Sequence, residues 1–349
     1  MISEVIKNTA LTTKVHGKLK KNLKHGLSQN DYQSLIELKD ITQITAYLKY
    51  NTNYGAVLSD INENYIHRGQ LESLLRTSVL KEYMSLSSFM PINKRRILRL
   101  FKQRQEIEKL KIYMRLMESG HTERFAAFLG SERAKYEIVD FQSVMGSTTF
   151  PTFLEAINKT VYYKILHPLI GNEEHFDIFT LEMALDMYYN KFALSTVSKN
   201  LTGVDKLVVK RTLGTEIDLS NIAFILRSKK YYNLANELIF PNIIPNYYKI
   251  SRECIREMVE SETTADIFDV IEKTHYKNAF PKDAVFLEND IKKFSLDTHK
   301  KMFRKFPNSI AAPLMYIHVK HNEIQNIIAI IEGIRYGWSG DEIKSYLSQ

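Results

Sequence analysis

The chain is poor in cysteine and in the residues that break helices. Its 349 residues include 13 glycines and 8 prolines, together about 6% of the chain against an average of about 12%. So few chain-breaking residues favour long helices with short connections, and disfavour a β-sandwich or barrel, which needs many turns. The single cysteine, Cys254, excludes a disulfide framework and a zinc site built on cysteines. It is also typical of a protein in a reducing compartment.

Long apolar runs are absent as well. The densest apolar segment, residues 324–334, is interrupted by polar residues and a glycine, and a membrane-spanning helix needs about 18 or more apolar residues. The first residues, Met1 to Val5, do not resemble the start of a signal peptide. We therefore expect no transmembrane segment in this chain, and contact with a membrane only as a peripheral subunit.

The balance of charge is moderately basic. The chain carries 48 Lys and Arg against 40 Asp and Glu, a formal net charge of +8, and 44% of its residues are hydrophobic. This composition is ordinary for a globular protein with a core. The positive excess indicates an acidic partner or an anionic surface. Because no recognition motif accompanies it, we expect no binding to nucleic acid.

An internal repeat is the most informative feature of the sequence. Three ungapped segments, 106–115, 218–227 and 323–332, each read acid, apolar, polar, Asn or Lys, apolar, and then a closing apolar pair. On a helix the second, fifth, eighth and ninth positions of such a segment share one face. The repeated motif is carried by the acids Glu106, Asp218 and Glu323, by Lys109, Asn221 and Asn326 at the fourth position, and by Arg227 at the end of the second copy.

Other landmarks recur in the same order at a period of about 110 residues. They are a Leu-Glu-x-x-Leu/Ile pattern at 71–75, 181–185 and 287–291, a breaker at Pro91, Gly203 and Pro307, and a Thr-x-Tyr pattern at 52–54, 160–162 and 274–276. This period predicts an all-α protein of three tandem helical modules, 1–130, 131–240 and 241–349, around a pseudo-threefold axis or in an arc. Leu110, Ile222 and Ile327 should then occupy equivalent buried positions.

The chain resembles the C (AC39) subunit family of rotary ATPases, which comprises the C subunits of prokaryotic V-type and A-type ATPases and the d subunit of the eukaryotic V-ATPase. The resemblance covers essentially the whole chain. It rests on the length, on the three repeats, on residues 216–222 and 225–229, and on residues 323–327 with the tail Gly337-x-Ser339-x-x-Glu342-Ile343. The first copy departs from the pattern, with Lys109 in place of Asn.

The resemblance implies a funnel-shaped, all-helical protein with threefold pseudo-symmetry. It implies a cytoplasmic position, peripheral on the membrane, where the protein connects the central shaft of the ATP-hydrolysing head to the membrane rotor ring. Such a subunit transmits torque for proton or sodium transport, has no catalytic site and needs no cofactor. The alternative from another class is a helical-repeat scaffold or adaptor outside any ATPase.

No recognisable catalytic or metal-binding motif appears in the sequence. It lacks a phosphate loop, a Gly-x-Gly-x-x-Gly turn and a Gly-x-Ser-x-Gly elbow. His318 and His321, with Glu323 following, could share a helix face, but a third ligand and the HExxH order are missing. We therefore predict no metal site.

The residues of the repeated motif are expected to be structural. An acid near a helix N-terminus or a turn is favoured by the helix dipole, and Asn221 and Asn326 are expected to bond to the backbone where repeats meet. The structural set is Asp218, Asn221, Arg227, Glu323 and Asn326.

Basic residues gather at 14–25, 94–104 and 292–305. They indicate either solvated helix faces or contacts with acidic partner subunits or membrane headgroups. The candidate partner contacts are Lys94, Arg95, Arg96 and Arg99.

Overall fold

The computed structural model describes residues 17, 26–88, 90–129, 138–170, 177–282 and 287–348. Within these ranges helices make up well over half of the residues, and no strand occurs. The predicted all-α class is therefore confirmed.

Three long helical hairpins form the frame of the described part of the chain. They are α4 (Arg68–Ser88) with α5 (Ile92–Glu118), α10 (Ile178–Asn200) with α11 (Gly203–Lys230), and α15 (Leu287–Lys305) with α16 (Ala311–Arg335). The breakers found in the sequence all lie at the hairpin tips. Pro91 is the N-cap of α5, Pro307 lies just before α16, and Gly203 has a φ of 54°, which glycine adopts without strain. In each hairpin the first helix carries the Leu-Glu-x-x-Leu/Ile landmark and the second carries the acid motif.

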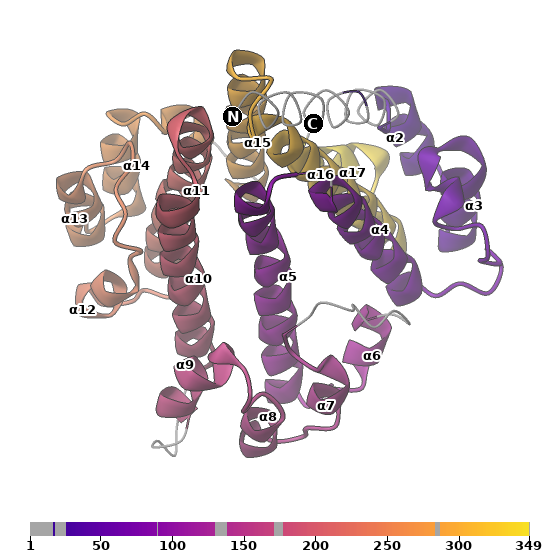
Figure 1. Cartoon of the computed structure of the whole chain (residues 1–349), viewed down its shortest axis with the longest axis horizontal. Helices are drawn as coiled ribbons and strands as arrows, with labels where there is room; N and C mark the ends of the chain where they lie inside the picture. Colours follow the sequence, from indigo (N-terminus) through magenta and orange to yellow (C-terminus); the bar gives the residue numbers. More distant parts are fainter. Residues whose placement is uncertain are drawn as a thin grey trace.

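The six long helices close into a ring. The two helices of each hairpin pack against each other, and between hairpins α5 packs against α10, α11 against α15, and α16 against α4. Each of these junctions brings the second helix of one hairpin against the first helix of the next, and the last junction joins the C-terminal hairpin to the N-terminal one. In Figure 1 the α10–α11 hairpin lies to the left, α5 in the middle, and α4 with α16 to the right. The threefold rotation that would relate the hairpins stays a prediction.

Short helices form three groups around this frame. They are α2 (Gln29–Ile36), α3 (Ile41–Asn51) and η1 (Asn53–Ala56); α6 (Arg124–Leu129), α7 (Phe141–Met145), α8 (Phe150–Ala156) and α9 (Val161–Ile170); and α12 (Asn236–Ile239), η2 (Phe240–Asn242), α13 (Arg252–Glu260), α14 (Thr264–Glu272) and η3 (Lys277–Ala279). The last helix, α17 (Gly340–Ser345), packs against α16 and α2. Helices this short are marginal alone, so local caps matter. Capping boxes at Ser28, Thr149, Thr263 and Ser339 satisfy the first amides of α2, α8, α14 and α17.

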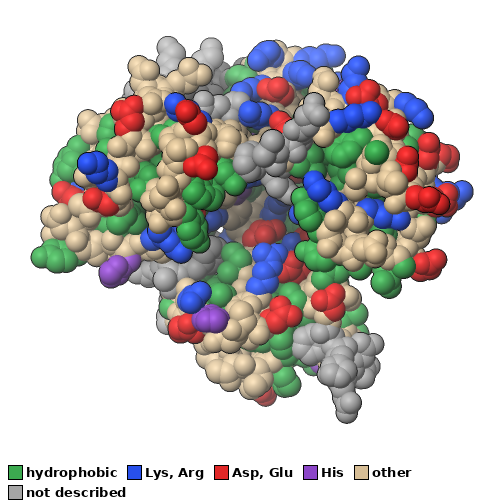
Figure 2. Space-filling model, turned by 180° about the vertical axis from the view of Figure 1, so that it is seen from behind, with side chains coloured by type: hydrophobic (Ala, Val, Ile, Leu, Met, Phe, Trp, Pro, Cys, Tyr) green, Lys and Arg blue, Asp and Glu red, His purple; other side chains and the backbone are tan. Residues whose placement is uncertain are grey.

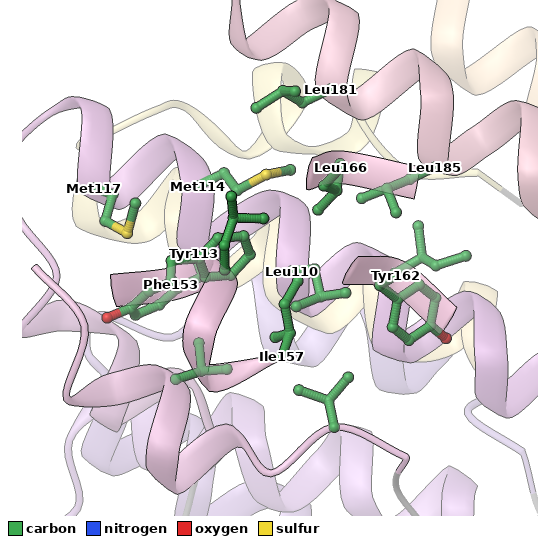
Figure 3. Close-up of a cluster of buried hydrophobic side chains, with 14 of the residues drawn as sticks. Leu110, Tyr113, Met114, Met117, Phe153, Ile157, Tyr162, Leu166, Leu181 and Leu185 are labelled. Atoms are coloured by element: carbon green, nitrogen blue, oxygen red, sulfur yellow. The ribbon is translucent and has the colours of Figure 1, made fainter. Parts of the chain in front are cut away.

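Each outer group of short helices shares an apolar core with the second helix of a hairpin. Leu110, Ile222 and Ile327 have no exposed area, and each lies in a different one of these cores. Figure 3 shows the first core, where Leu110 shares a cluster of buried side chains with Tyr162 of α9 and Leu185 of α10. The first core extends across residue 130 and the second across residue 240, where the sequence places module boundaries. Those boundaries stay a prediction.

A fourth core joins the three hairpins at their tips. It contains Ile97 from α5, Val208 from α11 and Ile317 from α16, and each of these side chains is at most 3% exposed. Because one core includes all three tips, it fixes the three hairpins to one another at this end.

Truncation of the repeated apolar residue should cost stability in all three cores. We expect Leu110→Ala, Ile222→Ala and Ile327→Ala each to lower the free energy of unfolding by about 2–5 kcal/mol, because each opens a cavity in a closed core. Urea unfolding followed by circular dichroism measures this. Val204→Ala, at a side chain that is 46% exposed, is the control. A control loss as large as the others would contradict the assignment.

Candidate functional site

Each hairpin carries one buried carboxylate bonded to a tyrosine from the following repeat. The Tyr162 hydroxyl donates to Glu106 at 3.0 Å, and the Tyr276 hydroxyl donates to Asp218 at 2.6 Å. The third pair closes the circle, because Tyr54 near the start of the chain donates to Glu323 near its end at 2.6 Å. The Thr-x-Tyr landmark and the acid motif are therefore two halves of one contact.

The same carboxylates also bind backbone amides of the segments that lead into the short helices. Asp218 accepts from the amides of Tyr248 at 3.1 Å and Lys249 at 2.6 Å. Glu323 accepts from Leu27 at 2.9 Å, and Glu106 accepts from Ile138. Each acid thus ties an incoming segment to a long helix.

The expectation that these acids stand near helix N-termini is wrong. Glu106, Asp218 and Glu323 lie well inside α5, α11 and α16 and are at most 4% exposed. The donors that a helix N-terminus would have supplied come instead from tyrosines and from amides of another segment. A helix dipole is therefore not what stabilises these charges.

Burial raises the pKa of Asp218 and of the three phenols. It raises the pKa of Asp218, against the hydrogen bonds from Tyr276 and from the amides, which lower it. Burial, together with the neighbouring carboxylate, also raises the pKa of the phenols of Tyr54, Tyr162 and Tyr276 above the ordinary value. The phenols therefore keep the proton that they donate.

The asparagines of the motif bind backbone. Asn221 does so where two repeats meet, as predicted, whereas Asn326 binds within its own repeat. Asn221 donates to the Ile244 carbonyl and accepts from the Ile244 amide, both at 2.9 Å. Asn326 makes the same reciprocal pair with Ser348, at 3.1 and 3.0 Å. Lys109 stands at this position in the first repeat, with its Nζ 5.1 Å from the centre of the Phe141 ring.

Arg227 differs from the other predicted motif residues in its exposure. It is exposed, and its Nε donates to the Ala223 carbonyl of the same helix at 3.2 Å. The other four predicted motif residues are buried and bonded to protein groups. Asp218, Asn221 and Glu323 bind residues of a neighbouring repeat, and Asn326 binds Ser348 of its own repeat.

A central cavity of about 640 Å³ lies within the ring. Its lining includes residues of five long helices, α4, α5, α11, α15 and α16, together with Tyr189 of α10. Among the described residues, basic side chains in the lining outnumber acidic ones. The acidic ones are Glu108 and Glu216. The basic ones are Arg76, Lys102, Arg104, Lys109, Arg115 and Lys292. Figure 2 shows that the molecule is hollowed near its middle, with both positive and negative side chains around the hollow.

A cluster of one carboxylate and two imidazoles stands in this cavity. Oε1 of Glu216 lies 3.1 Å from His299 Nε2 and 3.2 Å from His318 Nε2. The two imidazole rings stack with their centres 3.6 Å apart, and Arg104 Nη1 lies 3.2 Å from Oε2 of Glu216. The cluster joins α11, α15 and α16, and Arg104 adds α5.

The cavity alters the proton affinities of this cluster. Burial raises the pKa of Glu216, but hydrogen bonds from His299 and His318 and the charge of Arg104 outweigh it and hold that pKa well below its usual range. Burial and the neighbouring His318 lower the pKa of His299 to about 4. The pKa of His321 is lowered to about 3, by burial and then by His318. At neutral pH the cluster therefore holds an ionised carboxylate and a neutral His299.

The candidate partner contacts are placed differently from one another. Lys94 Nζ lies 2.7 Å from Asp205 Oδ2, Arg95 donates to the carbonyls of Met90 at 2.6 Å and Ser88 at 2.9 Å, and Arg96 donates to Asn200 at 2.7 Å. Those three tie the tip of α5 to neighbouring segments. Arg99 is exposed. The basic residues at 14–25 lie outside the described residues.

Sequence reasoning missed Glu216 and His299 as partners of His318. Glu216 lies 83 residues from His299 in the chain, and no motif connects them. The acid–tyrosine pairs could have been predicted from the sequence, however. Glu106 and Tyr162 are 56 residues apart, and Asp218 and Tyr276 are 58 residues apart. This nearly equal spacing is a signal that the two landmarks belong together.

Comparison with known proteins decides the family. Residues 11–346 match the family described as ATP synthase (C/AC39) subunit. The chain belongs to this family. Members are non-catalytic subunits of an ATPase, and the resemblance read from the sequence is confirmed.

Curated relatives carry the same name. The chain is 22% identical over 326 residues to the C subunit of the A-type ATP synthase of Methanosphaera stadtmanae, with 88% of this chain and 80% of the relative covered. It is 21% identical over 323 residues to that of Methanocaldococcus jannaschii, with 90% and 80% covered. For Methanobrevibacter smithii the identity is 23% over 319 residues, with 88% and 80% covered.

Among the described helices none combines the length and the apolar character that a transmembrane span requires.

Loss of a single tyrosine hydroxyl from an acid–tyrosine pair should destabilise the protein. We expect Tyr54→Phe, Tyr162→Phe and Tyr276→Phe each to cost about 1–3 kcal/mol, because a buried carboxylate loses a donor. Chemical unfolding measures this, with Tyr231→Phe, at a side chain that is 68% exposed, as the matched control. Equal stability of Tyr276→Phe and Tyr231→Phe would show that the hydroxyl has no such role.

Proposed function

We propose that the chain is the central-stalk subunit of an A- or V-type rotary ATPase. In this role it connects the central shaft of the soluble head to the membrane rotor ring, on the cytoplasmic face, and transmits torque for proton or sodium transport. The observation that carries the proposal is the ring of helices around a central cavity in a member of the C/AC39 family. A connector needs a socket and a frame that resists deformation, and the ring supplies both features.

The end of the shaft is proposed to enter the central cavity. The lining carries an excess of Lys and Arg, which favours a partner with acidic side chains at its tip. The cavity is framed by helices of all three repeats, so a load on its wall is shared among the three outer cores. The other side of the protein would then rest on the membrane ring.

Two neighbouring lysines test the socket. Lys292 lines the cavity and Lys293 does not, and both are exposed on α15. We expect Lys292→Glu to weaken binding to the purified shaft subunits roughly threefold to tenfold at low ionic strength and less at high ionic strength, because an exposed ion pair is worth about 0.2–1 kcal/mol and reversal adds repulsion.

Lys293→Glu carries the same change of charge one residue away. We expect it to bind the shaft subunits as the unchanged protein does. Equal effects of the two substitutions, or none from either at low ionic strength, would contradict insertion of an acidic shaft end into this cavity.

The basic stretch of Lys94, Arg95, Arg96 and Arg99 is proposed as an off-axis contact with an acidic partner subunit or with the headgroup region below the ring. The corresponding stretches of the second and third repeats are much less basic. The positive charge therefore distinguishes the first repeat from the other two. Lys94, Arg95 and Arg96 already have bonds within the chain. Arg99 is therefore the sharpest probe of an external contact.

Reversal of Arg99 should reduce assembly without harming the fold. We expect Arg99→Glu to lower incorporation into the reconstituted rotor, more at low than at high ionic strength, with an unchanged melting temperature. Arg124→Glu, at a side chain that is 68% exposed on α6, is the control. If both variants assemble identically at every ionic strength, the proposal is wrong and this stretch is a solvated helix face.

A further inference from the structure

Three potential metal ligands meet in the central cavity from three different helices. Glu216 comes from α11, His299 from α15 and His318 from α16, and one ligand atom from each lies within 4.8 Å of the other two. His299 is 3% exposed and His318 is 30% exposed. One ligand is therefore buried in the wall, and the cluster as a whole remains open to the cavity.

The distances are close to those of a zinc coordination shell. Zinc binds imidazole nitrogen at about 2.0–2.1 Å and carboxylate oxygen at about 2.0–2.2 Å, so neighbouring ligands of a tetrahedral ion lie about 3.3–3.5 Å apart. Both Nε2 atoms lie 3.1–3.2 Å from the same Glu216 oxygen. Both distances are slightly shorter than this separation. The two stacked rings, whose centres are 3.6 Å apart, must also turn away from each other before both Nε2 lone pairs point at one ion.

We propose that Glu216, His299 and His318 form a binding site for a divalent transition-metal ion of the zinc type. The two imidazoles and one carboxylate are a common three-ligand set for such an ion, with a water molecule in the fourth position. The fourth position faces the cavity, since His318 is the most exposed of the three ligands. The ion would cross-link the second repeat to the third.

The surroundings favour a nitrogen-binding ion over calcium or magnesium. Calcium and magnesium need several oxygen ligands, and the cluster offers one carboxylate. Imidazole suits Zn²⁺, Co²⁺, Ni²⁺ and Cu²⁺. Arg104 holds the second oxygen of Glu216 at 3.2 Å, which leaves Oε1 turned to the histidines and limits the carboxylate to one bond with the ion.

The proposal is tested on the isolated, untagged full-length chain with Co²⁺ as a spectroscopic probe. We expect saturable binding of one Co²⁺ per chain, visible as d–d absorption bands of tetrahedral or five-coordinate cobalt, and displacement of the bands by Zn²⁺. Bound metal should also raise the melting temperature in proportion to the logarithm of its concentration. Neither readout depends on the shaft subunits, so failure of the proposed function leaves this test intact.

His318→Gln and Glu216→Gln should each weaken Co²⁺ binding at least tenfold. His318 is the first choice, because its partly exposed side chain makes loss of the fold less of a concern, and circular dichroism checks each variant. The matched control is His321→Gln. His321 is in the same cavity and on the same helix, but lies outside the three-ligand cluster.

We expect His321→Gln to bind Co²⁺ as the unchanged protein does. Absence of d–d bands, or equal loss in His321→Gln and His318→Gln, would overturn the proposal. So would binding that survives in both His318→Gln and Glu216→Gln, since the ion would then be held elsewhere. In each of those cases the cluster is a hydrogen-bonded joint between helices and not a metal site.

Discussion

The architecture depends on a carboxylate buried inside a long helix and on the phenol that reaches it from the next repeat. A charge in such a place is costly unless hydrogen bonds compensate for its lost hydration. Here Asp218 receives Tyr276 and two backbone amides, and Glu323 receives Tyr54 and one amide. The contact therefore selects one register between neighbouring repeats, because a displaced segment would take the tyrosine and amide donors away from a buried carboxylate. Glu323 would keep its ion pair with Lys320 of the same helix, at 2.7 Å.

The same contact explains why the molecule is a closed object and not an open solenoid. In an open array the terminal repeats expose one face each. Here the pairing of Tyr54 with Glu323 joins the first repeat to the last, so both of these terminal faces are covered. The α4–α16 junction adds an ion pair between Arg68 and Glu332. It also adds a hydrogen bond from Tyr316 to Glu82. A cavity bounded by long helices on all sides follows from this closure. Its lining is less apolar than the outer cores, because the apolar faces of the long helices are largely used in the outer cores and at the tips.

Much of the fold could be predicted from the sequence because its determinants are local and repeated. The apolar stripe around Ile222, the breaker at Gly203 and the scarcity of glycine and proline each act within a few residues, and together they specified helical hairpins. Backbone bonds of Asn221 and Asn326 were expected for the same reason, since the motif repeats. The cluster of Glu216, His299 and His318 could not be found this way. Its members do not repeat, and only the closure of the ring brings α11, α15 and α16 together at that point.

The pairing of the repeats brings residues 27 and 348, far apart in the sequence, to one helix. Leu27 is held by Glu323 and Ser348 is held by Asn326, and these two positions of α16 are three residues apart. The order of the repeats around the ring is therefore cyclic. In mechanical terms the molecule is a hoop. A tangential force on any one hairpin is transmitted around the ring in both directions. No single non-covalent junction between hairpins therefore bears the whole load.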